Sequence, residues 1–180
     1  MSPPLLNLPC LRRGPAGLRH GFTLVELLVV MAVAVVMLSL AAPRMADFTA
    51  SNQLMVLKSD LAGAVAMART EAAKRGLPVI LTRVGSGPSG NEYAGGWELV
   101  GDDDSSGTAD SSEPRLRAHA ALGNELTLGG PTALGFRPTG ALMAGSAQTF
   151  LLCRSGTSKG YLITVAPSGV ADVANATSCP

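Results

Sequence analysis

The first part of the chain is defined by a long apolar run. In residues 22–42, the only polar side chains are those of Thr23, Glu26 and Ser39. About 20 apolar residues, at about 1.5 Å of rise each, form a helix long enough to cross a bilayer. A carboxylate within such a span is costly, and we expect it to have a partner. We therefore predict a transmembrane helix over residues 22–42 in which Glu26 has a function.

The apolar period changes after Pro43, a residue that is expected to kink the helix. From there, apolar residues recur at spacings of three, four or six and form one stripe of an amphipathic helix. The stripe consists of Met45, Phe48, Leu54, Leu57, Leu61, Val65, Ala68 and Ala72. Basic residues in the last turn, Gly76 at the cap and Pro78 beyond it indicate the end of the helix. We predict an amphipathic helix over residues 43–76 that packs on a sheet of the same chain.

The period changes to two from Leu77 onward, as is typical of strands separated by turns. The predicted strands cover residues 79–82, 96–100, 115–117, 125–128, 149–152 and 161–165. Aromatic residues make up 4% of the chain, and 21 glycines and 12 prolines are present, which favours a small, turn-rich β domain. The predicted fold class is α+β, with a long N-terminal helix packed on an antiparallel β domain formed by residues 77–180.

Residues 1–21 form a short basic leader that contains three arginines and no acidic residue. By the positive-inside rule, these arginines keep the N-terminus in the cytoplasm. The sequence GFTLVE at residues 21–26, followed by the apolar run, resembles the processing signal of type IV pilins and type II secretion pseudopilins. An ordinary secretory signal has a shorter apolar core and small residues at the cleavage site. The resemblance implies a pilin-like fold and a single-pass protein of the bacterial inner membrane with a periplasmic C-terminal domain.

The resemblance also implies how the N-terminus is processed. In such proteins, a membrane aspartic peptidase (the prepilin peptidase) cleaves between the residues matching Gly21 and Phe22, and the new N-terminus at Phe22 is methylated. Glu26 then lies about one helical turn from the new amine. It could neutralise that amine in its own chain or in a neighbouring subunit, which would set the register during assembly.

Later segments of the chain resemble the GspH/FimT pseudopilins. They are residues 61–81, Gly96-Trp97 with the acidic loop that follows, residues 136–140 with the apolar strand that ends at Cys153, and Gly169. The resemblance implies a minor structural subunit of a type II secretion pseudopilus or of a type IV pilus. Its expected partners are other major and minor pseudopilins or pilins, the inner-membrane assembly platform and exported substrates. Neither enzymatic activity nor a cofactor is expected.

The cysteines indicate a disulfide in the C-terminal part of the chain. Cys10 is removed with the leader, whereas Cys153 and Cys179 remain. In the oxidising periplasm, disulfides form and persist. We expect a bridge between these two residues; two unpaired thiols are the alternative.

The charge of the chain argues against general binding of nucleic acid. Removing the leader takes away three of the 14 basic residues and none of the 13 acidic ones, which leaves a net charge of −2. A basic face is nevertheless conceivable from Arg115, Arg117, Arg137, Arg154 and Lys159. Some FimT-type relatives bind DNA through a C-terminal Gly-Arg-x-Arg, but residues 168–172 of this chain contain no arginine. We therefore favour a secretion pseudopilin, with a DNA-capturing minor pilin as the alternative.

The acidic loop at residues 102–113 has the spacing of a twelve-residue calcium loop. The residues with side-chain oxygens at positions 1, 3, 5, 9 and 12 are Asp102, Asp104, Ser106, Asp110 and Glu113. Gly107 occupies position 6, where an EF-hand requires glycine. However, the predicted flanks are strands and not helices. A solvated loop between two strands is the alternative, and the presence of a metal stays open.

One further motif matches the serine-hydrolase pattern in form only. Residues 156–160 match G-x-S-x-G around Ser158, and His119 is the single histidine beyond the leader. The hydrolase motif requires a strand, a sharp turn and then a helix. Because a strand-like segment follows here, we predict a hairpin turn, and an anchored hydrolase is the disfavoured alternative.

Overall fold

The fold is known from a computed structural model that describes residues 21–179, except for the side chains of residues 40–44, 46, 47 and 50. The chain separates into two units, with the division between Pro43 and Arg44. Each unit is considered by itself. The predicted leader, including Cys10 and the three arginines, lies outside the described residues apart from Gly21.

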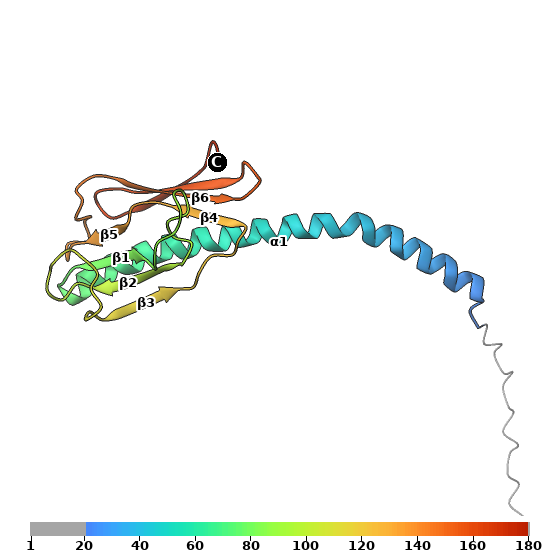
Figure 1. The fold of residues 1–180 in the computed structure, drawn as a ribbon, viewed down its shortest axis with the longest axis horizontal. Coiled ribbons are helices and arrows are strands. Elements are labelled where there is room, and N and C mark those ends of the chain that lie inside the picture. The colour runs from blue at the N-terminus through green and yellow to red at the C-terminus, as the bar shows by residue number, and fades with distance from the viewer. Residues whose placement is uncertain (1–20, 180) are drawn as a thin grey trace, which may run out of the picture. The chain divides into compact units, whose positions relative to one another are not determined.

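A single long helix, α1 (Leu24–Arg75), is followed by eight strands (Figure 1). Its start is capped by Thr23, whose Oγ1 accepts a hydrogen bond from the backbone N–H of Glu26 at 3.1 Å. It ends at Gly76, which has a φ of 69° and donates its N–H to the carbonyl of Ala72 at 3.0 Å. This left-handed cap is the predicted one. The helical backbone is continuous at Pro43, whose side chain is not described. The predicted kink at this residue stays a prediction.

In the first unit, the described side chains of residues 21–39 are exposed. Among the side chains that the structure describes, no helical stretch combines the length and apolarity that a membrane span requires. The predicted span over residues 22–42 extends into side chains outside the description, and it stays a prediction.

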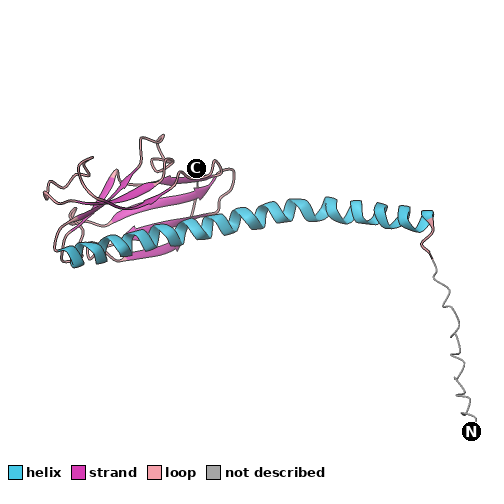
Figure 2. Ribbon diagram, turned by 90° about the horizontal axis from the view of Figure 1, so that it is seen from below, coloured by secondary structure: helices cyan, strands magenta, loops and turns pink. Residues whose placement is uncertain are grey.

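The second unit contains two four-stranded antiparallel sheets that lie along the C-terminal half of α1 (Figures 1 and 2). The first sheet has the order β3-β2-β1-β5: β3 (Arg115–His119), β2 (Trp97–Gly101), β1 (Val79–Arg83) and β5 (Ala133–Phe136). The second has the order β4-β6-β7-β8: β4 (Leu126–Gly129), β6 (Gln148–Arg154), β7 (Gly160–Val165) and β8 (Ala171–Asn175). The structure confirms the predicted α+β class.

Two strands, β5 and β8, were absent from the sequence prediction. β5 is a four-residue strand with glycine at its third position. β8 consists of Ala, Asp, Val, Ala and Asn, and four of its five side chains are exposed. Ala, Gly, Asp and Asn, which make up most of these residues, favour strands weakly, and neither segment shows an alternation of apolar and polar side chains. Pairing with β1 and with β7 therefore decides their conformation.

The core of the second unit lies between the amphipathic half of α1 and the sheets. Six of the eight predicted stripe residues are buried: Leu54, Leu57, Leu61, Val65, Ala68 and Ala72. The other two, Met45 and Phe48, are 63% and 64% exposed, so the buried stripe begins later than predicted. Among the strand residues, Leu81 and Phe150 are fully buried in the same core. Burying one large apolar side chain stabilises the fold by about 1.5–3 kcal/mol, so this stripe holds the helix to the sheets.

Candidate functional site

The start of α1 presents the predicted processing and assembly residues at the surface. Gly21 has open space around its Cα, and the Phe22 side chain is 82% exposed. Glu26 lies in the first helical turn, where the positive end of the helix dipole favours a carboxylate. Among the described residues, no basic group pairs with Glu26. The cleavage between Gly21 and Phe22 and the pairing of Glu26 with an amine stay predictions.

The rest of the first unit carries an unusual amount of exposed apolar surface. Its large exposed residues are Leu24, Val25, Leu27, Leu28, Val29, Val30, Met31, Val33, Val35, Val36, Met37 and Leu38. An apolar surface of this extent on a water-soluble monomer would favour aggregation. It therefore needs an apolar partner, such as lipid or the helices of other subunits.

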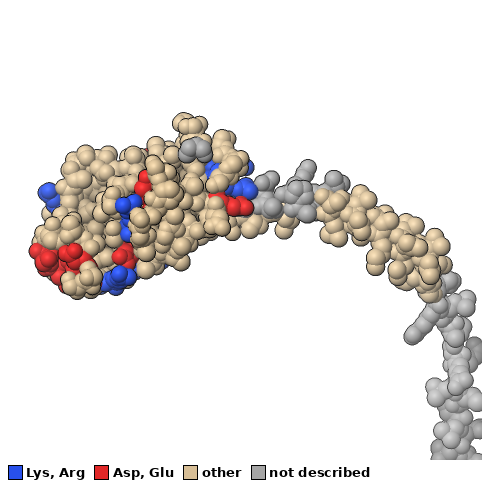
Figure 3. Space-filling model, in the orientation of Figure 1, with Lys and Arg blue, Asp and Glu red and all other residues tan. Residues whose placement is uncertain are grey.

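The acidic loop between β2 and β3 is organised by its own carboxylates. Asp102 is fully buried, and its two side-chain oxygens accept hydrogen bonds from the N–H groups of Ser106 and Gly107, each at 2.9 Å. Glu113 accepts in the same way from the N–H groups of Asp103 at 3.0 Å and Asp110 at 2.9 Å. Burial raises the pKa of the Asp102 carboxyl, whereas the two amide donors lower it. The backbone hydrogen bonds thus give the loop a defined shape. Acidic side chains gather at the end of the second unit where this loop lies (Figure 3).

These hydrogen bonds bear on the calcium hypothesis. Asp102, Asp104 and Glu113 bring one oxygen each to within 4.8 Å of one another. However, these carboxylates already accept backbone N–H groups, and the loop joins two strands and not two helices. The hydrogen bonds account for the acidic residues without an ion, and the calcium hypothesis stays untested.

The structure does not bring Ser158 and His119 together. Ser158 lies in the tight turn between β6 and β7, as predicted, whereas His119 ends β3 in the other sheet. The imidazole of His119 stacks on Trp97, with 3.9 Å between ring centroids, and its Nε2 lies 3.6 Å from Asp60 Oδ2. Its Nδ1 lies 2.8 Å from the Ala120 carbonyl, so one ring face and both nitrogens have neighbours, and nothing in this arrangement suggests a nucleophile and base.

The candidate basic residues form local pairs on several elements. Arg115 pairs with Glu98 at 3.2 Å, and Arg154 with Glu125 at 3.7 Å. The guanidinium groups of Arg117 and Arg137 contact Met67 Sδ at 3.8 Å and the Met143 carbonyl at 3.5 Å, respectively. Acids and methionines of separate elements thus already contact these four guanidinium groups.

The structure joins Cys153 and Cys179 in a disulfide, with Cα atoms 5.7 Å apart. Cys153 lies in β6 and is 2% exposed, whereas Cys179 follows β8. Gly160 in β7 is the partner of Cys153 in the sheet. A Cβ on Gly160 would collide with the Cys179 sulfur, so glycine leaves the space that the bridge occupies.

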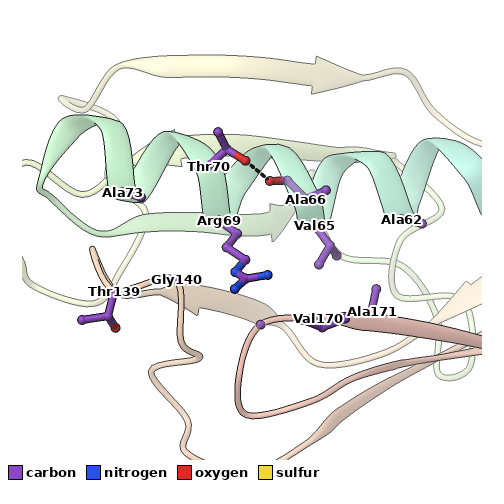
Figure 4. Close-up of a pocket in the computed structure, with 11 residues that line it drawn as sticks. Ala62, Val65, Ala66, Arg69, Thr70, Ala73, Thr139, Gly140, Val170 and Ala171 are labelled. Atoms are coloured by element: carbon purple, nitrogen blue, oxygen red, sulfur yellow. Dashed lines mark hydrogen bonds between the residues drawn. The ribbon is translucent and has the colours of Figure 1, made fainter.

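A groove that the sequence analysis did not identify lies between α1 and the turn that joins β7 to β8 (Figure 4). It has a volume of about 510 Å³. The side chain of Arg69 points from α1 into this groove, towards Gly140 and Gly169. The sequence had placed these three residues in separate segments of the GspH/FimT resemblance. Only the fold brings them together.

Comparisons with known proteins agree with this architecture. The family model described as type II transport protein GspH matches residues 59–169. The model of the prokaryotic N-terminal methylation motif matches residues 18–42. No curated protein matches the chain in sequence.

Two solved structures of the type IV minor pilin FimU from Pseudomonas aeruginosa (strain PAO1) are similar in fold. In space group P65, FimU aligns with a TM-score of 0.57 and 20% identity over 71% of this chain and 100% of FimU. In space group P21, the TM-score is 0.60 and the identity 21%, over 74% of this chain and 99% of FimU. At this identity the likeness shows the fold alone. The GspH and methylation-motif matches indicate a pilin-like structural subunit that is anchored in the membrane and assembles with other pilins. Because the GspH model covers more than half of the sequence, the chain belongs to the type II transport protein GspH family.

Proposed function

We propose that this chain is a minor pseudopilin, a structural subunit of the periplasmic pseudopilus of a type II protein secretion system. The observation that carries the proposal is the GspH match over residues 59–169, together with a methylation motif at residues 18–42. Prepilin peptidase cleaves after Gly21, and Phe22 becomes the methylated N-terminus. Residues 22–42 then anchor the subunit in the inner membrane, and residues 77–180 form its periplasmic β domain.

The exposed apolar surface of residues 24–38 supports a mechanism of assembly. In the membrane, this surface contacts lipid; in the fibre, it contacts the helices of neighbouring subunits. Glu26 is costly in the bilayer, where an isolated charge has no partner. Pairing with the N-terminal amine of a neighbouring subunit removes much of that penalty. The carboxylate therefore favours the assembled state and fixes the register of one helix against the next.

A second candidate is a minor pilin of a type IV pilus. The observation that favours it is the fold shared with FimU, which is such a pilin. Residues 168–172 comprise the end of the turn before β8 and the first two residues of β8. They contain no arginine, which weighs against the DNA-binding version of this role. The two candidates share the fold, the processing and the assembly mechanism, and they differ in the partner subunits.

A crosslinking pull-down from native membranes tests the proposal. The full chain carries a tag after Pro180, and mass spectrometry identifies both the crosslinked partners and the N-terminus of the chain itself. Secretion pseudopilins as partners, with a methylated N-terminus at Phe22, are the expected result. Pilus minor pilins with the same N-terminus would transfer the function to pilus biogenesis. An N-terminus other than Phe22 would contradict the proposed processing and the assembly mechanism built on it.

A further inference from the structure

We propose that the groove between α1 and the β7–β8 turn binds an acidic side chain of another pilin-like subunit, and that Arg69 is the residue that anchors it. This inference rests on the proposed function in one respect, namely that the chain assembles with other subunits. It adds a specific contact in the β-domain half of the molecule, where no assembly residue was predicted.

The exposed side chain of Arg69 lies in a slot formed by two glycines, Gly140 and Gly169. A Cβ on Gly140 would lie 2.8 Å from Nε and 3.0 Å from Cγ of Arg69. A Cβ on Gly169 would lie 3.4 Å from Cδ of Arg69 and would collide with the Gly140 carbonyl. Both glycines have left-handed backbones, with φ of 83° and 80°, which other residues adopt rarely. The stem of Arg69 therefore passes along backbone without side chains, and its end points into the groove.

The guanidinium of Arg69 has no partner among the described residues. Other arginines of the same unit do have partners: Arg75 pairs with Glu71 at 3.1 Å, and Arg115 pairs with Glu98 at 3.2 Å. A guanidinium presents five N–H donors in a fixed planar fork that matches the two oxygens of a carboxylate. Contacts of the stem with the two glycines reduce the side-chain entropy that is lost on binding.

The walls of the groove suit a side chain presented by a protein. On α1, the groove is lined by small residues, Ala62, Ala66 and Ala73, which allow another backbone to approach closely. The hydroxyl of Thr70 donates to the Ala66 carbonyl at 2.8 Å, so it is already satisfied. On the opposite wall, Val170 is 50% exposed and offers apolar contact (Figure 4). One cation within a small, largely apolar groove fits a carboxylate on an apolar segment better than a nucleic-acid backbone, which needs several cations.

Site-specific photocrosslinking in native membranes tests this inference on the full chain. The photoreactive residue p-benzoylphenylalanine replaces Ala66, which is exposed in the groove. We expect a crosslink to a peptide of another pilin-like subunit, with an Asp or Glu close to the crosslinked position. Arg69→Gln should reduce its yield by about tenfold because a charge-assisted pair is lost. Arg69→Lys should give an intermediate yield because lysine lacks the planar fork.

The matched control is Arg117→Gln, which removes a guanidinium from β3 of the same unit and should leave the crosslink unchanged. Unfolding followed by the fluorescence of Trp97, the only tryptophan, verifies that each variant folds. The decisive variant pair combines Arg69→Glu with Lys at the acidic partner position. Each single reversal should abolish the crosslink, and the double reversal should restore it.

The inference would be overturned if Arg69→Gln gave the same crosslink yield as the unchanged chain. It would also be overturned if the crosslinked peptide lacked an acidic residue or came from a second copy of this chain. A double reversal that failed to restore the crosslink would overturn it as well. These failures are distinct from failure of the proposed function. The tag after Pro180 would still recover secretion pseudopilins if only the groove contact is wrong, whereas it would recover pilus pilins or no pilin-like partner if the proposed function itself is wrong.

Discussion

The disulfide between Cys153 and Cys179 allows a quantitative prediction about the stability of the second unit. The two residues are 26 positions apart, and the loop that they close contains β7 and β8. Replacing Cys179 by Ser removes the bridge at the less buried of the two residues. This choice leaves the β6 position unchanged, where Cys153 is 2% exposed and a hydroxyl would itself be destabilising.

The expected magnitude follows from the closed loop. In the chain-entropy account, the bridge restricts the unfolded chain, and a loop of this length gives about 3.5 kcal/mol of stabilisation. In the folded state, too, loss of the bridge is expected to be destabilising. Without the bridge, the segment after β8 is held to β7 mainly by the hydrogen bond from Ala176 N–H to the Gly160 carbonyl at 3.0 Å. We therefore expect Cys179→Ser to lower the free energy of unfolding by about 3.5 kcal/mol.

The assay is urea unfolding of the full chain in detergent, followed by the fluorescence of Trp97, which is buried in the second unit. With an m-value of about 1.7 kcal/mol/M, the midpoint should fall by about 2 M. The reduced wild-type chain should unfold at the same midpoint as the variant. Ser178→Ala is the matched control, because it changes an exposed neighbour of Cys179, leaves the bridge in place and should not shift the midpoint. If both the variant and the reduced wild type shift by less than about 0.5 M, the loop-closure reasoning is refuted.

Three further predictions concern other parts of the chain. Glu26→Ala should leave membrane insertion and cleavage intact but reduce the recovery of the chain in crosslinked assemblies; normal incorporation would contradict the pairing model. Leu61→Ala should lower the free energy of unfolding by about 2–5 kcal/mol in the same fluorescence assay, because Leu61 is fully buried against the sheets. Hydrogen bonds from Gly90 N–H, at 3.0 Å, and from other backbone amides lower the pKa of Glu92 below its usual 4.5. Its stabilising effect is therefore present above about pH 4.5 and lost as the pH falls through the lowered value, and Glu92→Gln should weaken this acid dependence.

Much of the fold could be predicted because local patterns in this chain agree with the tertiary structure. The helix end at Gly76 depends on a left-handed cap, which glycine adopts without penalty, so sequence and backbone point to the same residue. β8 could not be predicted, because four of its five residues (Ala, Asp, Ala and Asn) favour strands weakly and pairing with β7 decides its conformation. The predicted stripe begins at Met45, whereas the buried stripe begins at Leu54. A helical period shows which residues share a face, but it does not show where the sheets that cover this face begin.

The functional residues divide in the same way. Gly21, Phe22 and Glu26 could be proposed from sequence, because a peptidase and a membrane recognise a contiguous segment. The slot around Arg69 could not, because it needs a residue of α1, a turn after β5 and a turn after β7 to meet. No spacing along the chain encodes that meeting. A hint existed in the sequence, since all three positions fall in segments that resemble the GspH/FimT pseudopilins.

The two units derive their stability from different sources, and this difference affects how variants should be interpreted. The buried core consists of residues between Leu54 and Val165, all in the second unit. The large apolar side chains described in the first unit are exposed, so they bury little surface within this chain. Their transfer from water depends on lipid or on other subunits. A polar substitution at Val30 should therefore weaken anchoring or assembly while leaving the urea midpoint of the second unit unchanged. A defect in assembly with an unchanged midpoint thus identifies an assembly residue, whereas a loss of both identifies a residue of the core.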